Sequence, residues 1–284
     1  MRERSGSLSR FLALLTVAVL LAGCVTGVLA EEFVPSEGYS RVVEVPGLGE
    51  MQYYAQNDPM WADAIYEPYD GRGIRIMSRT GCGPTVVAMA LANLLTPEEL
   101  TSLLSHARTA ERGYSLCPHS VNGLLHKTED HRLFYPQTGE DFVTYLPMII
   151  AAYATGNNDR NIRYRQADSG GTSIDIFEGM ARVYGLRFQQ TKDLLKANEM
   201  LRDGCAVITT AVAGPFTKES HYMLFAGIKW GWVYVLDPAW REVYDNDPKG
   251  ILDVVEPGLV RFRVDDYDRV EMYNFYVYSR PDSE

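Results

Sequence analysis

The stretch that most constrains this chain is Gly81-Cys82-Gly83-Pro84, which leads into a small and apolar run without another glycine or proline until Pro97. Proline is tolerated in the first turn of a helix. We therefore predict that Cys82 lies at the N-terminus of a buried helix that ends near Leu95. Free N–H groups and the helix dipole favour a thiolate there. The alternative is an inert cysteine buried in the core.

The first thirty residues predict export. A basic start precedes an apolar run at residues 11–22 that is short for a membrane span. The chain offers a lipobox-like site that would place a lipid on Cys24, and a signal-peptidase site after Ala30. An uncleaved anchor over residues 11–30 is the third option. We expect residues 1–30 to be a signal peptide or lipoprotein signal, and the protein to be extracellular or attached to the cell envelope.

The net charge limits the classes of binding partner that we expect, and the number of cysteines bears on which thiols are free. The chain has 284 residues and a formal net charge of -10, which disfavours binding to nucleic acid or to anionic membranes. Membrane attachment is expected only through a lipid on Cys24 or the uncleaved anchor. Without Cys24 three cysteines remain, and an odd number in an exported protein indicates a free thiol. A disulfide between Cys117 and Cys205 would leave Cys82 free, but the pairing stays open.

The order of predicted elements indicates an α+β fold, because helices come first and strands second. Thr96 and Glu99 form a capping-box pattern around a helix start, and Gly185 is placed to end a helix that starts at Thr172. Further helices are predicted at residues 142–154 and 194–201, and strands at residues 206–210, 222–226, 232–236, 260–264 and 272–278. We expect a lead-in at residues 31–50 and one domain at residues 51–280. An insertion at about residues 114–169 would shape or cover the cleft.

His221 is the histidine best placed to serve a cysteine nucleophile. It starts a strand, and a turn at Trp230-Gly231 would bring Asp237 back beside it at the open end of a hairpin. A carboxylate in that place fixes the tautomer and orientation of an imidazole. His221 follows Cys82 by about 140 residues, within the range of about 130–150 typical of papain-like enzymes. Alternatively, Asp237-Pro238 is simply a turn at a strand end.

Five motifs in this order resemble the papain-like cysteine peptidases grouped with the bacteriocin-processing (double-glycine leader) peptidases, in their stand-alone exported branch. The motifs are YYAQNDPMWAD at 53–63, GCGPTVVAMAL at 81–91, GGTSIDIFEGMARVYGL at 170–186, HYMLFAGI at 221–228 and VYVLDPA at 233–239. The resemblance implies a papain-like fold with the nucleophile helix packed on a C-terminal antiparallel sheet. It implies Cys82 as nucleophile, His221 as general base and acid, Asp237 as orienting residue and Gln56 as oxyanion donor.

The expected function is that of an exported thiol hydrolase that cleaves a peptide or amide bond through a cysteine thioester. Its substrate would be a peptide or protein, cell-envelope components included. A non-catalytic envelope binding protein and an acyl or peptidyl transferase are the alternatives. No metal or other cofactor is expected, because two candidate metal sites fit no common pattern. They are the group Cys117, His119, His126 and His131, and the loop Asp245-Asn246-Asp247-Pro248-Lys249-Gly250.

Overall fold

A computed structural model describes residues 39–67, 75–105, 139–156, 158, 160, 162–164 and 171–281. The predicted signal at residues 1–30, with Cys24, lies outside these residues. So do residues 31–38 of the predicted lead-in and the group of Cys117, His119, His126 and His131. The described residues belong to one compact unit, Pro35–Glu284. Across these described ranges, none of the helices combines the length and the apolar character needed to cross a membrane.

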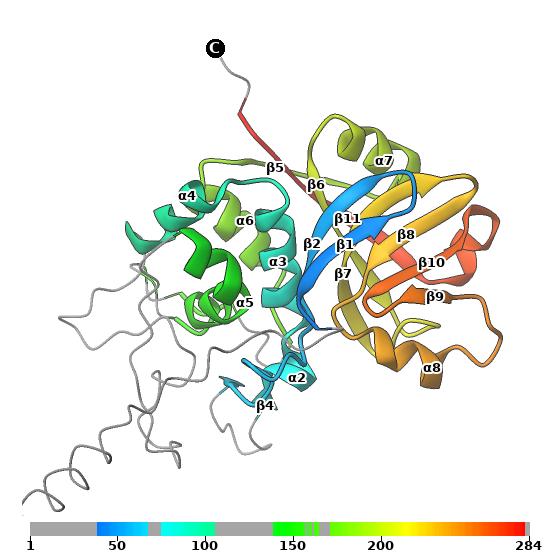
Figure 1. Cartoon of the computed structure of the whole chain (residues 1–284), viewed down its shortest axis with the longest axis horizontal. Helices are drawn as coiled ribbons and strands as arrows, with labels where there is room; N and C mark the ends of the chain where they lie inside the picture. Colours follow the sequence, from blue (N-terminus) through cyan, green and yellow to red (C-terminus); the bar gives the residue numbers. More distant parts are fainter. Residues whose placement is uncertain are drawn as a thin grey trace, which may run out of the picture. The chain divides into compact units, whose positions relative to one another are not determined.

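An antiparallel sheet of seven strands, in the order β5-β11-β6-β7-β8-β10-β9, is the centre of the fold (Figure 1). Five of these strands match the predictions, whereas β5 and β9 at the two edges were not predicted. The strands are β5 Arg187–Thr191, β6 Ala206–Val212, β7 Ser220–Lys229, β8 Trp232–Leu236, β9 Asp253–Glu256, β10 Leu259–Arg263 and β11 Met272–Ser279. The protein is thus mixed helix and sheet, which is compatible with the expected α+β class.

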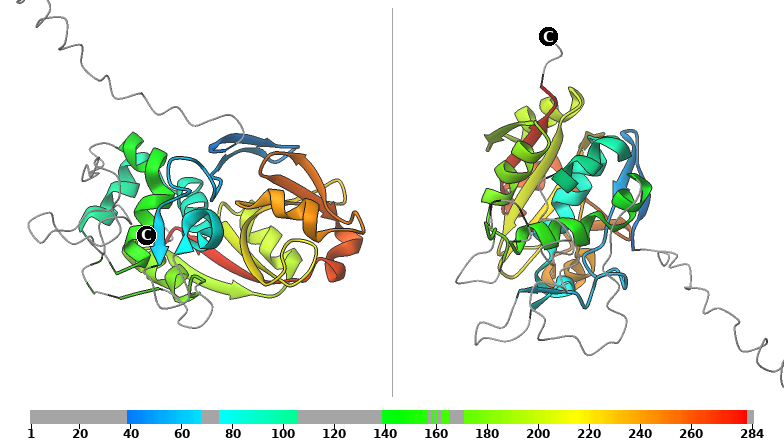
Figure 2. Two further views of the ribbon diagram at one scale, coloured as in Figure 1. Left: turned by 90° about the horizontal axis from the view of Figure 1, so that it is seen from below. Right: turned by 90° about the vertical axis from the view of Figure 1, so that its left-hand side faces the viewer.

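The two faces of the sheet carry separate hydrophobic cores, because successive strand residues point to opposite faces. On one face, Ile208 and Leu224 pack with the helices α3 Cys82–Ala92, α5 Gly139–Ala154 and α6 Asp175–Val183. On the other face, Val207 and Phe225 pack against Ala197 of α7 Leu194–Arg202. Figure 2 shows the helices and strands that cover these two faces from two further directions. The sheet is therefore buried on both sides, which fixes the positions of the residues at its strand ends.

The predicted nucleophile helix is α3, Cys82–Ala92, and every residue from Gly83 to Leu91 is buried. It packs on β7 and β6, as expected for a helix lying on the sheet. The predicted capping box of Thr96 and Glu99 is present at α4, Pro97–Leu100, with a 3₁₀ turn η1 at Thr101–Ser105. Helix α6, Asp175–Val183, begins at Asp175 rather than at the expected Thr172, and Gly185 follows its end with φ +63°.

Two stretches differ from their predicted placement. Within the predicted insertion, α5 Gly139–Ala154 packs on α3 and shares the main core, so this part is no separate cover of the cleft. Within the predicted lead-in, β1 Arg41–Val45 pairs with β2 Gly49–Tyr53, and the buried Val43 and Val45 join the same core. A second small pairing joins β3 Ile65–Glu67 to β4 Arg75–Ile76, just before α2 Met77–Thr80. Residues 41–50 of the predicted lead-in therefore belong to the fold.

Candidate active site

Cys82 is the first residue of α3, and its side chain is partly exposed. The glycines on either side of it are required by close contacts. A Cβ at Gly81 would lie 2.4 Å from the carbonyl oxygen of Met77, and a Cβ at Gly83 would lie 2.2 Å from Oγ1 of Thr172. Real Cβ atoms do not come that close, so any larger residue at either position would displace the backbone beside the thiol.

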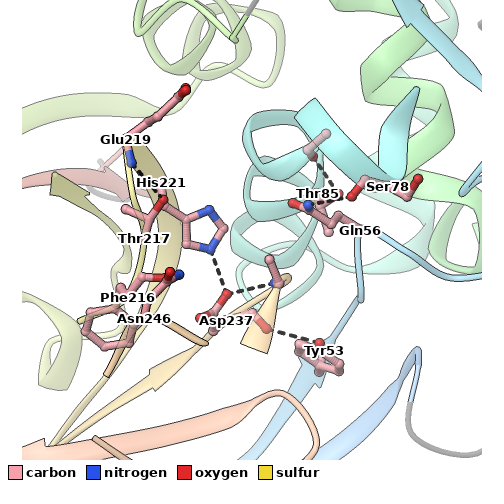
Figure 3. A network of polar contacts seen from close by, with 12 residues as sticks. Tyr53, Gln56, Ser78, Thr85, Phe216, Thr217, Glu219, His221, Asp237 and Asn246 are labelled. Carbon is pink, nitrogen blue, oxygen red and sulfur yellow. Dashed lines mark hydrogen bonds and ion pairs between the residues drawn. The ribbon is translucent and has the colours of Figure 1, made fainter. Parts of the chain in front are cut away.

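His221 and Asp237 meet as the hairpin register predicts. Trp230 and Gly231 have φ of 53° and 76°, as a two-residue turn of type I′ requires. The turn joins β7 to β8, and the strands return His221 and Asp237 to the same end of the hairpin. Nε2 of His221 lies 2.6 Å from Oδ1 of Asp237, and both side chains are buried (Figure 3). Asp237 is therefore a partner of His221 and not only a turn residue.

The environment of His221 favours its charged form. Burial lowers the pKa of the imidazole, but the charge of Asp237, the hydrogen bond to Asp237, and the hydrogen bond and charge of Cys82 raise it. The net effect places the His221 pKa well above its ordinary value. Because Nε2 faces Asp237, the nitrogen left for Cys82 is Nδ1. The imidazole thus links the thiol on one side to the carboxylate on the other.

Gln56 lies in the loop after β2, and two hydrogen bonds hold it beside Cys82. Its backbone N–H donates to the carbonyl oxygen of Pro238 at 3.0 Å, and its Nε2 donates to the carbonyl oxygen of Ser78 at 2.9 Å (Figure 3). A side-chain amide carries two N–H donors, so one is left for a ligand. The buried Oε1 has no hydrogen-bond partner among the described residues. Gln56 therefore fits the role of a donor to a bound carbonyl oxygen.

The four predicted residues come together around one cleft. It has a volume of about 540 Å³, and three of the four, Gln56, Cys82 and His221, line it, with Asp237 behind His221. The remaining lining residues are Arg79, Thr80, Gly171, Thr217, Lys218, Glu219, Ser220, Glu242, Asp245 and Asn246. The sequence predicted none of these ten as catalytic residues. Burial chiefly raises the pKa of Glu242, and the opposing charge of His221 lowers it.

Cys205 provides a contrast to Cys82. It is also a free, partly exposed cysteine. Its predicted disulfide partner, Cys117, lies outside the described residues. Burial and the charge of Asp203 raise the pKa of the Cys205 thiol. Its surroundings therefore disfavour a thiolate.

Comparisons with known proteins add no family. A scan against protein-family models and a search of curated proteins found no match to this chain. The parts of the chain that the structure describes contain no group of three or more His, Cys, Asp and Glu side chains that could hold a metal ion.

Proposed function

We propose that this protein is an exported, papain-like thiol hydrolase that cleaves a peptide or amide bond through a cysteine thioester. One observation carries the proposal. His221 is hydrogen-bonded to Asp237 and lies close enough to Cys82 for the thiol to raise the His221 pKa, and both Cys82 and His221 line the cleft. A thiol, an imidazole and a carboxylate in this order are the arrangement needed for nucleophilic catalysis.

The proposed reaction begins with attack of the Cys82 thiolate on the substrate carbonyl carbon. A C–S bond forms, and the carbonyl oxygen takes the negative charge. The free N–H of the Gln56 amide and the backbone N–H of Cys82, in the first turn of α3, are the donors for this oxyanion. The His221 imidazolium then gives its proton to the leaving nitrogen as the C–N bond breaks, which leaves an acyl thioester on Cys82.

The second half of the reaction reverses these roles. Neutral His221 removes a proton from water, and the resulting hydroxide attacks the thioester carbon. The C–S bond breaks, the thiolate returns and His221 is again protonated. Attack by an amine in place of water would make the protein a transferase with the same residues. A non-catalytic binding protein requires neither the His221 proton nor the free Gln56 N–H.

The first experiment measures thiol reactivity in the full chain. We expect iodoacetamide at pH 6 to label Cys82 faster than Cys205, because only Cys82 has an imidazolium beside it. Peptide mapping gives both rates in one sample, and His221→Ala is the control that should remove the difference. Equal and slow labelling of the two thiols would contradict a reactive Cys82.

A second experiment tests turnover. Incubation with a mixture of unstructured peptides in H₂¹⁸O, followed by mass spectrometry, should give new C-termini that contain ¹⁸O. New peptide bonds without ¹⁸O would indicate the transferase. Fast labelling of Cys82 without either product, across peptides of varied sequence, would favour the binding protein.

A further inference from the structure

We propose that Tyr53, supported by Arg41 on the neighbouring strand, is a positioning residue that holds Asp237 in hydrogen-bonding contact with His221. The inference rests on the proposed function only for the role of the His221–Asp237 pair. It assigns a task in the active site to the N-terminal hairpin β1–β2, which the sequence placed in and beside a lead-in segment.

Tyr53 makes a direct contact with the main chain of Asp237. The fully buried Tyr53 donates its hydroxyl hydrogen to the carbonyl oxygen of Asp237 at 3.1 Å (Figure 3). On the other side, the N–H of Asp237 donates to the carbonyl oxygen of Gly258 at 2.8 Å. Gly258 also packs on the Tyr53 ring, because a Cβ there would lie 2.4 Å from Cζ of Tyr53. Tyr53 therefore contacts the Asp237 carbonyl oxygen directly and packs on Gly258, the residue that accepts the hydrogen bond of the Asp237 N–H.

In the part of the chain that the structure describes, hydrogen bonds hold the Asp237 carboxylate through only one of its two oxygens. Oδ1 accepts hydrogen bonds from His221 and from the N–H of Ala239, at 2.6 and 2.7 Å. The buried Oδ2 has no partner among the described residues. A carboxylate held through one oxygen takes its position largely from its backbone. A shift of that backbone would pass directly to the contact with His221.

Arg41 holds Tyr53 in place on the side of β1. Arg41 and Tyr53 are directly paired across β1 and β2, and the guanidinium carbon lies 5.9 Å from the Tyr53 ring centroid. Arg41 donates to the carbonyl oxygen of Pro257 at 2.9 Å and to the carboxylate of Glu256 at 2.8 Å. These bonds tie the hairpin to the turn that carries Gly258. Hairpin, turn and Asp237 thus form one connected unit.

The test compares Tyr53→Phe with Tyr184→Phe in the full chain. Tyr184 is the matched control, because its hydroxyl donates to the carbonyl oxygen of Leu100 at 3.0 Å and it does not line the cleft. Each variant loses one phenol–carbonyl hydrogen bond, so similar losses of stability in urea unfolding are expected. The deciding measurement is the titration of His221 by NMR with labelled histidine, assigned with His221→Asn.

We expect Tyr53→Phe to lower the His221 titration midpoint by roughly half a pH unit or more, because a nearby opposite charge accounts for about one to three units when well placed. Tyr184→Phe should leave the midpoint unchanged. An unchanged midpoint in Tyr53→Phe, with a stability loss equal to that of Tyr184→Phe, would overturn the proposal and leave Tyr53 a packing residue.

Arg41→Met is the second variant, and it decides the matter if Tyr53→Phe does not fold. It keeps Tyr53 but removes both bonds to the turn, so a smaller downward shift of the same midpoint is expected, and no shift would overturn the proposal. The NMR readout does not need turnover. A protein without hydrolytic activity whose His221 midpoint still shifts would contradict the proposed function and leave this inference intact.

Discussion

The two walls of the cleft are built in different ways. In the wall that carries Cys82, the first turn of α3 has a local hydrogen bond, from the hydroxyl of Thr85 to the carbonyl oxygen of Gly81, four residues apart. The wall that carries His221 depends on contacts between distant segments, such as Tyr53 and Asp237, 184 residues apart. The nucleophile is thus placed by one helix end, whereas its base is placed by the assembled sheet. Substitutions in the two walls should therefore change the activity of the protein in different ways.

The largest expected effect belongs to the Cys82 wall. Cys82→Ala should abolish hydrolysis, because no thioester can form without the thiol. The helix should still fold, since Cys82 is its first residue and only partly buried. Peptide cleavage and urea unfolding measure the two properties. Cleavage that persists in Cys82→Ala would place the nucleophile elsewhere.

Asp237 in the other wall should show a graded response. We expect Asp237→Ala to lower kcat/KM more than Asp237→Asn, because an amide still accepts a hydrogen bond from the imidazole. The effect of Asp237→Asn should stay below the factor of about 10⁴ seen for serine triads, since the thiolate–imidazolium pair forms before the substrate binds. An unchanged kcat/KM in Asp237→Ala would contradict the orienting role despite the 2.6 Å contact.

Gln56 links the two walls, and its removal should separate catalysis from thiol reactivity. Gln56→Ala should slow turnover by about 10²–10³, the usual effect of losing one oxyanion donor. Alkylation of Cys82 should stay close to the wild-type rate, because the reaction with iodoacetamide develops no oxyanion. Equal losses in both measurements would show that Gln56 acts by supporting Cys82, through its bond to Ser78, and not as a donor to the substrate.

The same difference explains what the sequence could predict. The Cys82 helix, the capping box at Thr96 and the Trp230-Gly231 turn follow from local residue patterns, and all three are present. The approach of Asp237 to His221 was also predictable, because a two-residue turn fixes the hairpin register. Local patterns thus predicted Cys82, His221 and Asp237 as candidates, whereas Gln56 was implied only by the resemblance to papain-like peptidases.

The edge strand β5 and the β1–β2 hairpin depend on tertiary packing, which local sequence patterns do not predict. β5 is a polar edge strand with the sequence RFQQT, so it lacks the apolar alternation by which strands are recognised. β1 and β2 are five residues each, and they are stabilised by the sheet on which they lie. The contact of Tyr53 with Asp237 follows only from this docking. The contact by which Tyr53 supports Asp237 and His221 could therefore not be predicted from the sequence.

The smallest expected effect concerns an ion pair away from the cleft, between α4 and the residue that follows β11. Arg280, just after β11, binds both carboxylate oxygens of Glu99 at 2.6 Å, and neither residue lines the cleft. The Arg280 hydrogen bond, with the backbone N–H of Thr96, lowers the pKa of Glu99 to about 2. A lowered carboxylate pKa stabilises the fold at pH values above the unfolded pKa, and this contribution is lost as the pH falls through the folded value.

Glu99→Gln should therefore lower the free energy of unfolding at pH 7 by about 0.5–1 kcal/mol, because both side chains are exposed and solvent weakens such pairs. Its difference from the wild type should shrink between about pH 4.5 and 2 and vanish near pH 2, while hydrolysis at pH 7 stays unchanged. Glu178→Gln is the control: its pair with Arg182, at 3.5 Å within α6, should contribute about 0.3 kcal/mol or less. A difference that persists at pH 2 in urea unfolding would mean that Glu99 acts through the capping box alone. The ion pair between Arg280 and Glu99 would then contribute nothing to the attachment of α4 to the end of β11.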